Sequence, residues 1–414
     1  FCNDKDIHVQ IANEIAKLCL NKYKSLNKTG KPASNEWTIL SGIALQQSNG
    51  KLHLVSLATG TKCLGGSELS KLKSNEIGTK LGDSHAEVLA RRAFLRYLYE
   101  QLNLLIDNCQ SEIFCMDDNK AVELRDGISF HFFTSQTPCG DCSIFPKKDT
   151  AEDCEPSVKI RKMNSNNKTI AENSDVFGEK EKVFKDIYRT GAKCLVTEKS
   201  QDPHLPGTEY HTVGPLRTKP GRGDPTLSLS CSDKMAKWIV LGLQGALLSI
   251  LIPNIKIATV TVGGGCPFSL EAMERGLYKR FNLNSSELTI MQADLSFEHK
   301  KGNERSHPCP SSIIWSNVKK GNPEIAVEGR KQGATKKKGG RYLLVTKRNL
   351  FETFLKVCDK YGKSEFHIRH PKKLFYTDCK LWAKNYQETW TRMKLEAFSA
   401  WPNKPFYNTI SNSR

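Results

Sequence analysis

Two short segments of the chain carry side chains that can hold a metal ion and move protons. His85 and Glu87 lie in the segment 83–87 (DSHAE), and Cys139 and Cys142 lie in the segment 137–142 (TPCGDC). Imidazole nitrogens and thiolates are preferred ligands of Zn²⁺, and three protein ligands leave the fourth tetrahedral position open for water. The metal lowers the pKa of that water toward about 7, and a neighbouring carboxylate can carry its protons. The residue types therefore predict an open zinc site in which Glu87 moves protons and does not bind the metal.

Each segment alone is a weak signal. A His-x-Glu triplet occurs by chance, and a Cys-x-x-Cys pair can also form a structural zinc site or a redox pair. Together and in this order, the segments match the pattern of the zinc nucleoside deaminases, although the spacing does not distinguish cytosine from adenine as the target. We expect each segment to lie at the start of a helix, where the peptide dipoles stabilise a thiolate such as that of Cys139.

Hydrophobic periodicity predicts the elements that must position these segments. It indicates a helix over 7–26, a hairpin of strands 37–45 and 52–57 around Asn49-Gly50, a helix over 87–105 and a strand over 128–134. Further along, it predicts a helix over 233–251, a strand over 255–262 and a helix over 270–281. Helices and strands therefore alternate in an α/β core.

The composition indicates a globular protein with a polyanionic partner. The chain has 414 residues, 38% of them hydrophobic, and a net charge of +18. Residues 319–414 hold 22 basic and 8 acidic side chains, interleaved with aromatic residues, which favours packed basic helices that meet nucleic acid. The longest apolar run, 239–252, contains Gln244 and is too short to span a membrane, so we interpret it as a buried helix.

Two further features bear on organisation and location. Residues 146–186 have nine basic and nine acidic side chains and few large apolar ones, which predicts a flexible surface insertion. The fourteen cysteines are dispersed and not spaced as a disulfide framework, which favours a reducing compartment, cytoplasmic or nuclear. No leader pattern is recognisable at the N-terminus, so secretion is not expected.

Three further segments carry a resemblance to a known family. The segments 229–234 (LSCSDK), with Trp238, and 242–245 (GLQG) resemble the adenosine deaminases acting on RNA. The segment 329–337 (GRKQGATKK) resembles the tRNA-specific branch of that family in particular. The resemblance implies a single domain over 1–414 with a cytidine-deaminase-like mixed sheet sandwiched by helices and a basic helical C-terminal part. It also implies hydrolysis of adenosine to inosine in tRNA, at the position 3′ of the anticodon in alanine tRNA, with no obligatory protein partner.

The resemblance changes one metal ligand. In this family the third zinc ligand is the cysteine of the SCSDK segment, which is Cys231 here, whereas the simpler deaminase pattern selects Cys142. We favour Cys231, because it also precedes a predicted helix, and we interpret Cys142 as a core thiol. The choice between these two cysteines stays open at this point.

The family also places inositol hexakisphosphate in the core of the fold. The sequence offers independent support, because Lys234, Lys237 and Trp238 share one face of a largely apolar helix, and buried cations need counter-charges. The alternative is that these are surface lysines whose aliphatic stems cover the core. Three positions depart from the editing enzymes: Lys237 replaces an arginine, Trp390 a lysine and Asn403 a glutamate. The contacts that the resemblance implies are Arg91, Arg92, Ser228, Lys234, Lys237, Trp238, Lys347, Tyr376, Lys380, Tyr386, Gln387, Trp401 and Lys404.

Residues near the zinc site follow from the same resemblance. It implies a polar chain from the anion to the metal through Asp83 and Lys234, with Lys219 near it, although Asp83 can equally cap a helix. It also implies substrate contacts from two segments, 61–62 after the predicted hairpin and 219–224 (KPGRGD). Asp224 stands where the editing enzymes carry a base-displacing glutamate, and its shorter side chain fits a target already unstacked in a loop. An ordinary Gly/Pro turn explains the second segment equally well. The implied substrate contacts are Thr61, Lys62, Lys219, Arg222 and Asp224.

Two alternative functions remain. One is an editing-type deaminase that acts on another class of RNA. The other is a non-catalytic RNA-binding protein whose zinc is structural. Glu87 argues against the second alternative, because a structural zinc site does not need that carboxylate.

Overall fold

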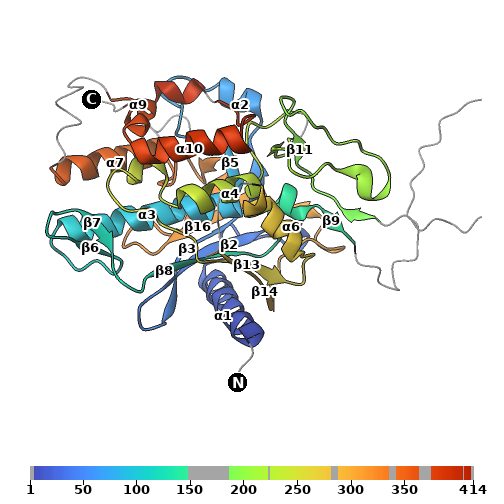
Figure 1. The fold of residues 1–414 in the computed structure, drawn as a ribbon, viewed down its shortest axis with the longest axis horizontal. Coiled ribbons are helices and arrows are strands. Elements are labelled where there is room, and N and C mark those ends of the chain that lie inside the picture. Colours follow the sequence, from blue (N-terminus) through green and yellow to red (C-terminus); the bar gives the residue numbers. More distant parts are fainter. Residues whose placement is uncertain are drawn as a thin grey trace, which may run out of the picture.

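A central mixed β-sheet with helices on both faces organises the molecule (Figure 1). The computed structural model describes residues 4–147, 186–221, 224–280, 288–334, 342–362, 374–403 and 405–411. The expected α/β architecture, a mixed sheet between helices with a basic helical C-terminal part, is confirmed. The eight strands of the sheet, in spatial order, are β14 (Thr289–Ser296), β13 (Thr259–Gly264), β8 (Ser129–Thr134), β2 (Leu40–Gln46), β3 (Leu52–Thr59), β16 (Ser311–Ser316), β17 (Glu324–Val327) and β18 (Arg330–Lys331).

The strands at the centre of the sheet follow the sequence prediction closely. Strand β13 pairs in parallel with both β14 and β8, and the other neighbours in the sheet are antiparallel. The β2–β3 hairpin turns at Gly50, whose φ of 80° is a left-handed conformation that suits glycine. Phe130, Phe132 and Phe133 of β8 are all buried, as expected for a strand covered on both faces.

Helix α1 (Asp4–Ser25) covers one face of the sheet (Figure 1). Its buried residues Ala12, Ile15, Cys19 and Tyr23 recur every three or four positions and form one apolar stripe. The stripe lies directly on β2, where a Cβ atom at Gly42 would stand 2.8 Å from the Cys19 sulfur. The absence of a side chain at Gly42 therefore allows the helix to approach the strand.

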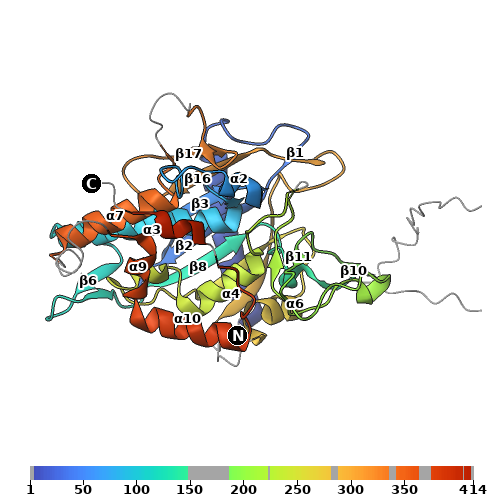
Figure 2. The same cartoon turned by 90° about the horizontal axis from the view of Figure 1, so that it is seen from above.

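The opposite face carries two layers of helices, which lie one above the other in Figure 1 and are seen from above in Figure 2. Helix α3 (Ala86–Ile106) lies against β2, β3 and β16, and α4 (Cys231–Leu241) lies beside it. The C-terminal helices α7 (Lys347–Lys360), α9 (Tyr376–Leu381) and α10 (Lys384–Glu396) form the outer layer. They contact α3, α4 and α5 (Gly245–Leu248). Aromatic residues of this basic region pack inward, and the region is not a solvated tail.

Three predicted elements differ from the structure. The helix predicted over 233–251 is broken into α4 and α5, because Gly242 adopts a φ of 81° and the Gln244 side chain bonds the Leu241 carbonyl and the Ile255 N–H. The strand predicted over 255–262 begins only at Thr259, because Ile255 instead pairs with the connection between these helices. The helix predicted over 270–281 is α6 (Leu270–Glu274) followed by a π-helical turn, Arg275–Lys279. Gly276, in that turn, packs directly against the backbone and sulfur of Cys142.

Short elements complete the described chain. Strand β9 (Phe145–Pro146) pairs antiparallel with β10 (Ile187–Tyr188), and the predicted insertion between them lies outside the described residues from 148 to 185. Among the described helices, none combines the length and the apolar character needed to cross a bilayer. The remaining elements are α2 (Gly66–Ser70), the strand pairs β1 (Glu36–Trp37) with β15 (His307–Pro308), β4 (Thr61–Cys63) with β5 (Asp83–His85), β6 (Phe114–Met116) with β7 (Val122–Leu124) and β11 (Lys193–Cys194) with β12 (Arg217–Thr218), and the 3₁₀ turns Asp141–Ser143, Gly207–Tyr210 and Pro405–Thr409.

Candidate active site

The fold brings three metal-binding side chains together from distant parts of the chain. His85 ends β5 and precedes the first residue of α3, Cys139 follows β8, and Cys231 begins α4. The Nδ1 atom of His85 lies 3.9 Å from the Cys139 sulfur and 3.6 Å from the Cys231 sulfur. A tetrahedral zinc ion with ordinary ligand distances separates its nitrogen and sulfur ligands by roughly 3.5 Å. The donor types and their separations therefore fit one zinc ion.

The N-terminus of α4 stabilises a thiolate at Cys139. The Cys231 N–H donates to the Cys139 sulfur over 3.3 Å. A hydrogen bond with the Cys231 side chain and the nearby charge of Lys219 hold the pKa of the Cys139 thiol well below its ordinary value, against the effect of burial. The expectation that Cys139 itself precedes an α-helix is wrong, since only a 3₁₀ turn follows it. The helix whose dipole acts on this sulfur comes from another part of the chain.

Cys142 lies outside this cluster. Its side chain is fully buried, and its sulfur is 3.9 Å from the Met273 carbonyl oxygen of α6. Burial raises the pKa of the Cys142 thiol to about 12, so this residue stays a neutral thiol. Its contacts are those of a core residue.

Glu87 lies in the first turn of α3, two residues after His85. Its side chain is 1% exposed, and its Oε2 atom has no hydrogen-bond partner among the described residues. Burial raises the pKa of the Glu87 carboxyl above its ordinary value. A buried carboxyl group with a free oxygen and a raised pKa is suited to accept and return protons.

Asp83 connects the zinc cluster to the interior of the fold. Its carboxylate accepts hydrogen bonds from Lys219 over 3.0 and 2.8 Å, from Lys234, and from the His85 backbone N–H over 3.0 Å. Burial disfavours the charged form, but the two lysines outweigh it and hold the pKa of Asp83 well below its ordinary value. The alternative role of Asp83 as a helix cap is wrong, because the N-cap of α3 is His85 and the backbone group that the Asp83 side chain bonds is the N–H of that residue, before the helix begins.

Cys63 is a site residue that the sequence analysis missed. It lies on β4 opposite Asp83 on β5, and its sulfur is 3.4 Å from the Asp83 carboxylate. Cys63, Asp83 and His85 form a second possible ligand set. Because two lysines already neutralise Asp83, the set with Cys139 and Cys231 fits a zinc ion better. Only the register of the β4–β5 pair could have indicated Cys63.

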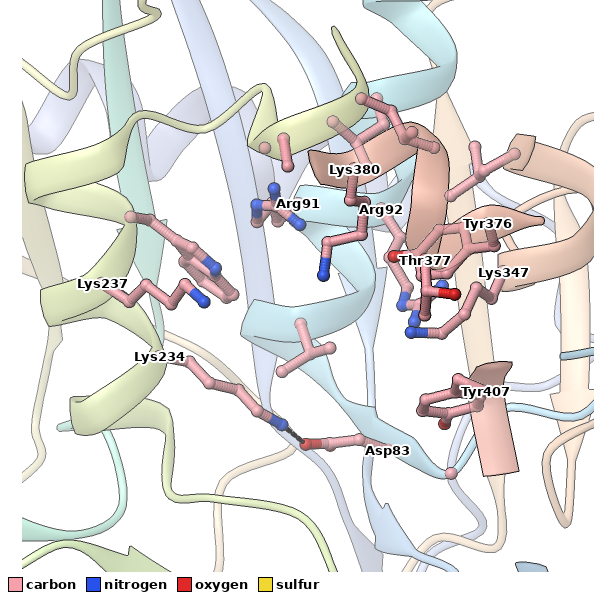
Figure 3. A pocket seen from close by; sticks show the side chains of 18 of the residues that line it. Asp83, Arg91, Arg92, Lys234, Lys237, Lys347, Tyr376, Thr377, Lys380 and Tyr407 are labelled. Carbon is pink, nitrogen blue, oxygen red and sulfur yellow. Dashed lines mark hydrogen bonds and ion pairs between the residues drawn. The ribbon is translucent and has the colours of Figure 1, made fainter. Parts of the chain in front are cut away.

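A cavity of about 440 Å³ lies behind the zinc cluster (Figure 3). Among the described residues, six cationic side chains line it and Asp83 is its one carboxylate. Figure 3 shows Arg91, Lys237 and Lys380 extending toward the same space. The predicted anion contacts that line this cavity are Arg91, Arg92, Ser228, Lys234, Lys237, Trp238, Lys347, Tyr376, Lys380, Tyr386 and Trp401.

Aromatic rings hold several of these cations in place. The Lys237 ammonium lies 3.4 Å from the centre of the Trp390 ring and 4.8 Å from that of Trp401. Trp390, a departure from the family's pattern, therefore supports Lys237 through a cation–π contact. Burial and neighbouring cations hold the pKa of Lys237 well below its ordinary value. A cavity wall with this excess of positive charge is suited to bind an anion.

Two predicted contacts of this cavity stand apart from it. Gln387 does not line the cavity, and its side-chain amide donates to the Lys380 carbonyl over 2.7 Å. Lys404 lies outside the described residues. The sequence analysis missed other lining residues, among them Gln244, Thr377 and Tyr407, because they come from separate elements with no common spacing.

Of the predicted substrate contacts, Thr61 and Lys62 lie on β4 beside the strand that carries His85. Thr61 pairs with His85 across β4 and β5, and its buried hydroxyl has no hydrogen-bond partner among the described residues. Lys62 lines a small recess beside Cys63. The Asp224 carboxylate accepts hydrogen bonds from Ser67, and Arg222 lies outside the described residues.

Comparison with known proteins agrees with this geometry. The family described as the adenosine-deaminase (editase) domain matches residues 56–405. The chain belongs to this family. It therefore carries a hydrolytic deaminase domain. The adenosine-deaminase match includes the zinc cluster, Glu87 and nearly all of the cationic cavity.

Several curated members of the adenosine-deaminase family are similar to this chain. The "tRNA-specific adenosine deaminase 1" of Drosophila melanogaster is 38% identical, over 99% of this chain and 100% of its own length. The Homo sapiens protein of the same name is 33% identical, over 95% of this chain and 98% of its own length. The "Double-stranded RNA-specific editase Adar" of Drosophila melanogaster is 26% identical, over 95% of this chain and 54% of its own length.

Proposed function

We propose that this protein hydrolyses adenosine to inosine in tRNA, at the position 3′ of the anticodon in alanine tRNA. The observation that carries the proposal is the cluster of His85, Cys139 and Cys231 beside the buried carboxyl group of Glu87, whose Oε2 atom finds no hydrogen-bond partner in the part of the chain that the structure describes. The full-length similarity to proteins named tRNA-specific adenosine deaminase 1 supports tRNA as the substrate class. The net charge of +18 favours a polyanionic substrate.

Each residue of the site has a role in this reaction. A zinc ion held by His85, Cys139 and Cys231 would supply an activated water as the nucleophile. Glu87 takes a proton from the attacking water and delivers it to the purine ring, and it then takes the proton of the newly added hydroxyl group and delivers it to the departing ammonia. Contacts with the RNA come from Thr61, Lys62 and Arg222. The Lys219 ammonium donates hydrogen bonds to Asp83 and so holds this carboxylate behind the metal ligands.

Inosine mapping on total tRNA tests this proposal. We expect incubation with the purified protein to convert the adenosine 3′ of the anticodon in alanine tRNA to inosine. Detection by reverse transcription and sequencing identifies every converted position. Activity confined to long duplex RNA would instead support the editing-type alternative. Tight RNA binding without inosine formation would support the non-catalytic alternative.

We also propose that the cationic cavity holds inositol hexakisphosphate. Among the described residues, six cationic side chains and one carboxylate line this cavity of about 440 Å³, an excess of positive charge that favours a polyanionic ligand. The ligand would neutralise this wall, and Lys234 would lie between the ligand and Asp83. A highly charged, compact ligand agrees with the polar lining and with the aromatic supports beneath Lys237.

Stability measurements and phosphate analysis test this second proposal. We expect denatured protein to release about one inositol hexakisphosphate per chain. The double variant Arg91→Met, Lys380→Met should lose the ligand, and its thermal midpoint should fall by several degrees, because bound ligand stabilises the folded state. Lys384→Met, an exposed residue of α10, is the matched control and should change neither property. If the cavity holds no anion, removing two clustered cations should raise the midpoint, and that result would overturn the proposal.

We propose further that the chain forms a single deaminase domain and acts in a reducing compartment, cytoplasmic or nuclear. The family match over 56–405 supports the first statement. The fourteen dispersed cysteines support the second.

A further inference from the structure

The structure assigns Asp224 a positioning role in this reaction: its carboxylate and Ser67 form a latch between two segments that border the zinc site. The assignment rests on the proposed tRNA deamination. The resemblance puts Asp224 among the RNA contacts, as the counterpart of a base-displacing glutamate. In this structure its carboxylate is already engaged with the protein.

The contacts of Asp224 are specific. Its Oδ2 atom accepts hydrogen bonds from the Ser67 hydroxyl over 2.6 Å and from the Ser67 backbone N–H over 3.0 Å. Ser67 lies in the first turn of α2, where backbone N–H groups have no partner within the helix. The N-cap residue of α2, Gly65, has no side chain that could cap the helix, so Asp224 satisfies this N–H from a segment 157 residues away.

Backbone contacts align the two segments beside the latch. The Gly66 N–H donates to the Pro225 carbonyl over 2.8 Å, and Gly65 forms an antiparallel bridge with Thr226. The Asp224 carboxylate contacts Gly65 closely, because a Cβ atom at position 65 would stand 1.8 Å from Oδ2 of Asp224. Glycine at position 65 is therefore needed for the close approach.

Both segments carry residues of the active site. The first leads back through Leu64, whose N–H bonds the Gly82 carbonyl, to β4 with Thr61 and Lys62. The second leads back to Lys219, whose carbonyl accepts from the Thr226 hydroxyl over 2.6 Å and whose ammonium holds Asp83. The latch therefore fixes the position of β4, which borders the zinc site, relative to Lys219, which holds Asp83.

A latch and an RNA contact predict opposite results for Ser67. If Asp224 acts through Ser67, then Ser67→Ala and Asp224→Ala should each lower kcat/KM on tRNA by about three- to tenfold, as expected for hydrogen bonds to a charged group at a partly exposed site. The double variant should be no worse than Asp224→Ala, because Asp224→Ala already removes both hydrogen bonds and Ser67→Ala removes only that of the hydroxyl. Ser67→Thr keeps the hydroxyl and should restore most of the activity.

The variant Gly65→Ala disrupts the Ser67–Asp224 interaction in a second way. It leaves both polar partners in place and displaces the carboxylate sterically, and Gly65 has a φ of −63°, which alanine adopts without strain. We expect the same loss as in Asp224→Ala. Ser25→Ala is the control and should retain full activity, because Ser25 is an exposed serine at the end of α1 whose hydroxyl bonds only the Lys22 carbonyl among the contacts of the described residues.

Zinc content and thermal midpoint should be measured on every variant. A variant that loses activity but keeps both properties has a displaced segment, whereas a variant that loses both is unfolded. The latch is refuted if Ser67→Ala and Gly65→Ala are fully active while Asp224→Ala is impaired, because Asp224 would then act on the RNA itself. Additive losses in the double variant would refute it as well. A wild-type protein that forms no inosine in tRNA would overturn the proposed function, whereas an active wild-type protein with an active Ser67→Ala variant overturns the latch alone.

Discussion

Replacing Glu87 by Gln should lower the rate of inosine formation by about 10²- to 10⁴-fold and leave RNA affinity nearly unchanged. The amide has the size of the carboxyl but cannot take up and return protons. Glu87 is not among the three clustered metal ligands, so zinc content should stay at the wild-type level. Single-turnover measurement of inosine formation at saturating tRNA, together with a binding isotherm, tests both halves of this expectation.

Two further variants make the Glu87 experiment specific. Glu100→Gln changes the same functional group near the other end of α3 and should be as active as the wild type. Glu87→Asp keeps the carboxyl but withdraws it from the site, so its activity should also be strongly reduced. Substantial deamination by Glu87→Gln would remove Glu87 from the role of proton carrier.

Replacing Cys231 by Ala should reduce bound zinc to below about a tenth of the wild-type content and abolish deamination. The reason is that a site with only His85 and Cys139 lacks one of the three protein ligands of a catalytic zinc. Cys142→Ala should keep its zinc, because the Cys142 sulfur faces the Met273 carbonyl and stays protonated. Elemental analysis of dialysed protein gives the zinc content per chain.

The pair of cysteine variants discriminates between the two ligand assignments. Loss of zinc on Cys142→Ala alone would overturn the assignment of Cys231. Cys358→Ala serves as a control, since Cys358 is a buried thiol of α7 that belongs to neither ligand set, and it should keep both zinc and activity.

Local patterns in the sequence were sufficient for the elements that carry the site. The periodicity of residues 7–26 predicts α1, and the Asn49-Gly50 turn predicts the β2–β3 hairpin, because both signals come from neighbouring residues. The break between α4 and α5 was missed, because an apolar run around Gly242 looks the same for one continuous helix as for two short ones. Only the contacts of Gln244 with both sides of the break distinguish them.

The metal site itself depends on long-range packing. Spacing places His85 next to Glu87, but the sequence cannot say which of Cys142 and Cys231 approaches Cys139. The cluster joins residues 54 and 92 positions apart, and its geometry follows from the packing of α3, α4 and β8. The resemblance to a family supplied Cys231, whereas no signal in the sequence indicated Cys63, whose place depends on strand register.

The β9–β10 pair gives the chain a permissive point for engineering. Pro146 faces Ile187 across this pair, and Lys147 and Asp186 contact each other through both backbone and side chains, so the chain leaves and re-enters the fold at one place. Doubling the length of a loop with fixed ends changes folding free energy by only about 0.6 kcal/mol. A purification tag or a fluorescent reporter inserted between Lys147 and Asp186 would therefore have both ends held at one place, and the effect of its length on folding should be small.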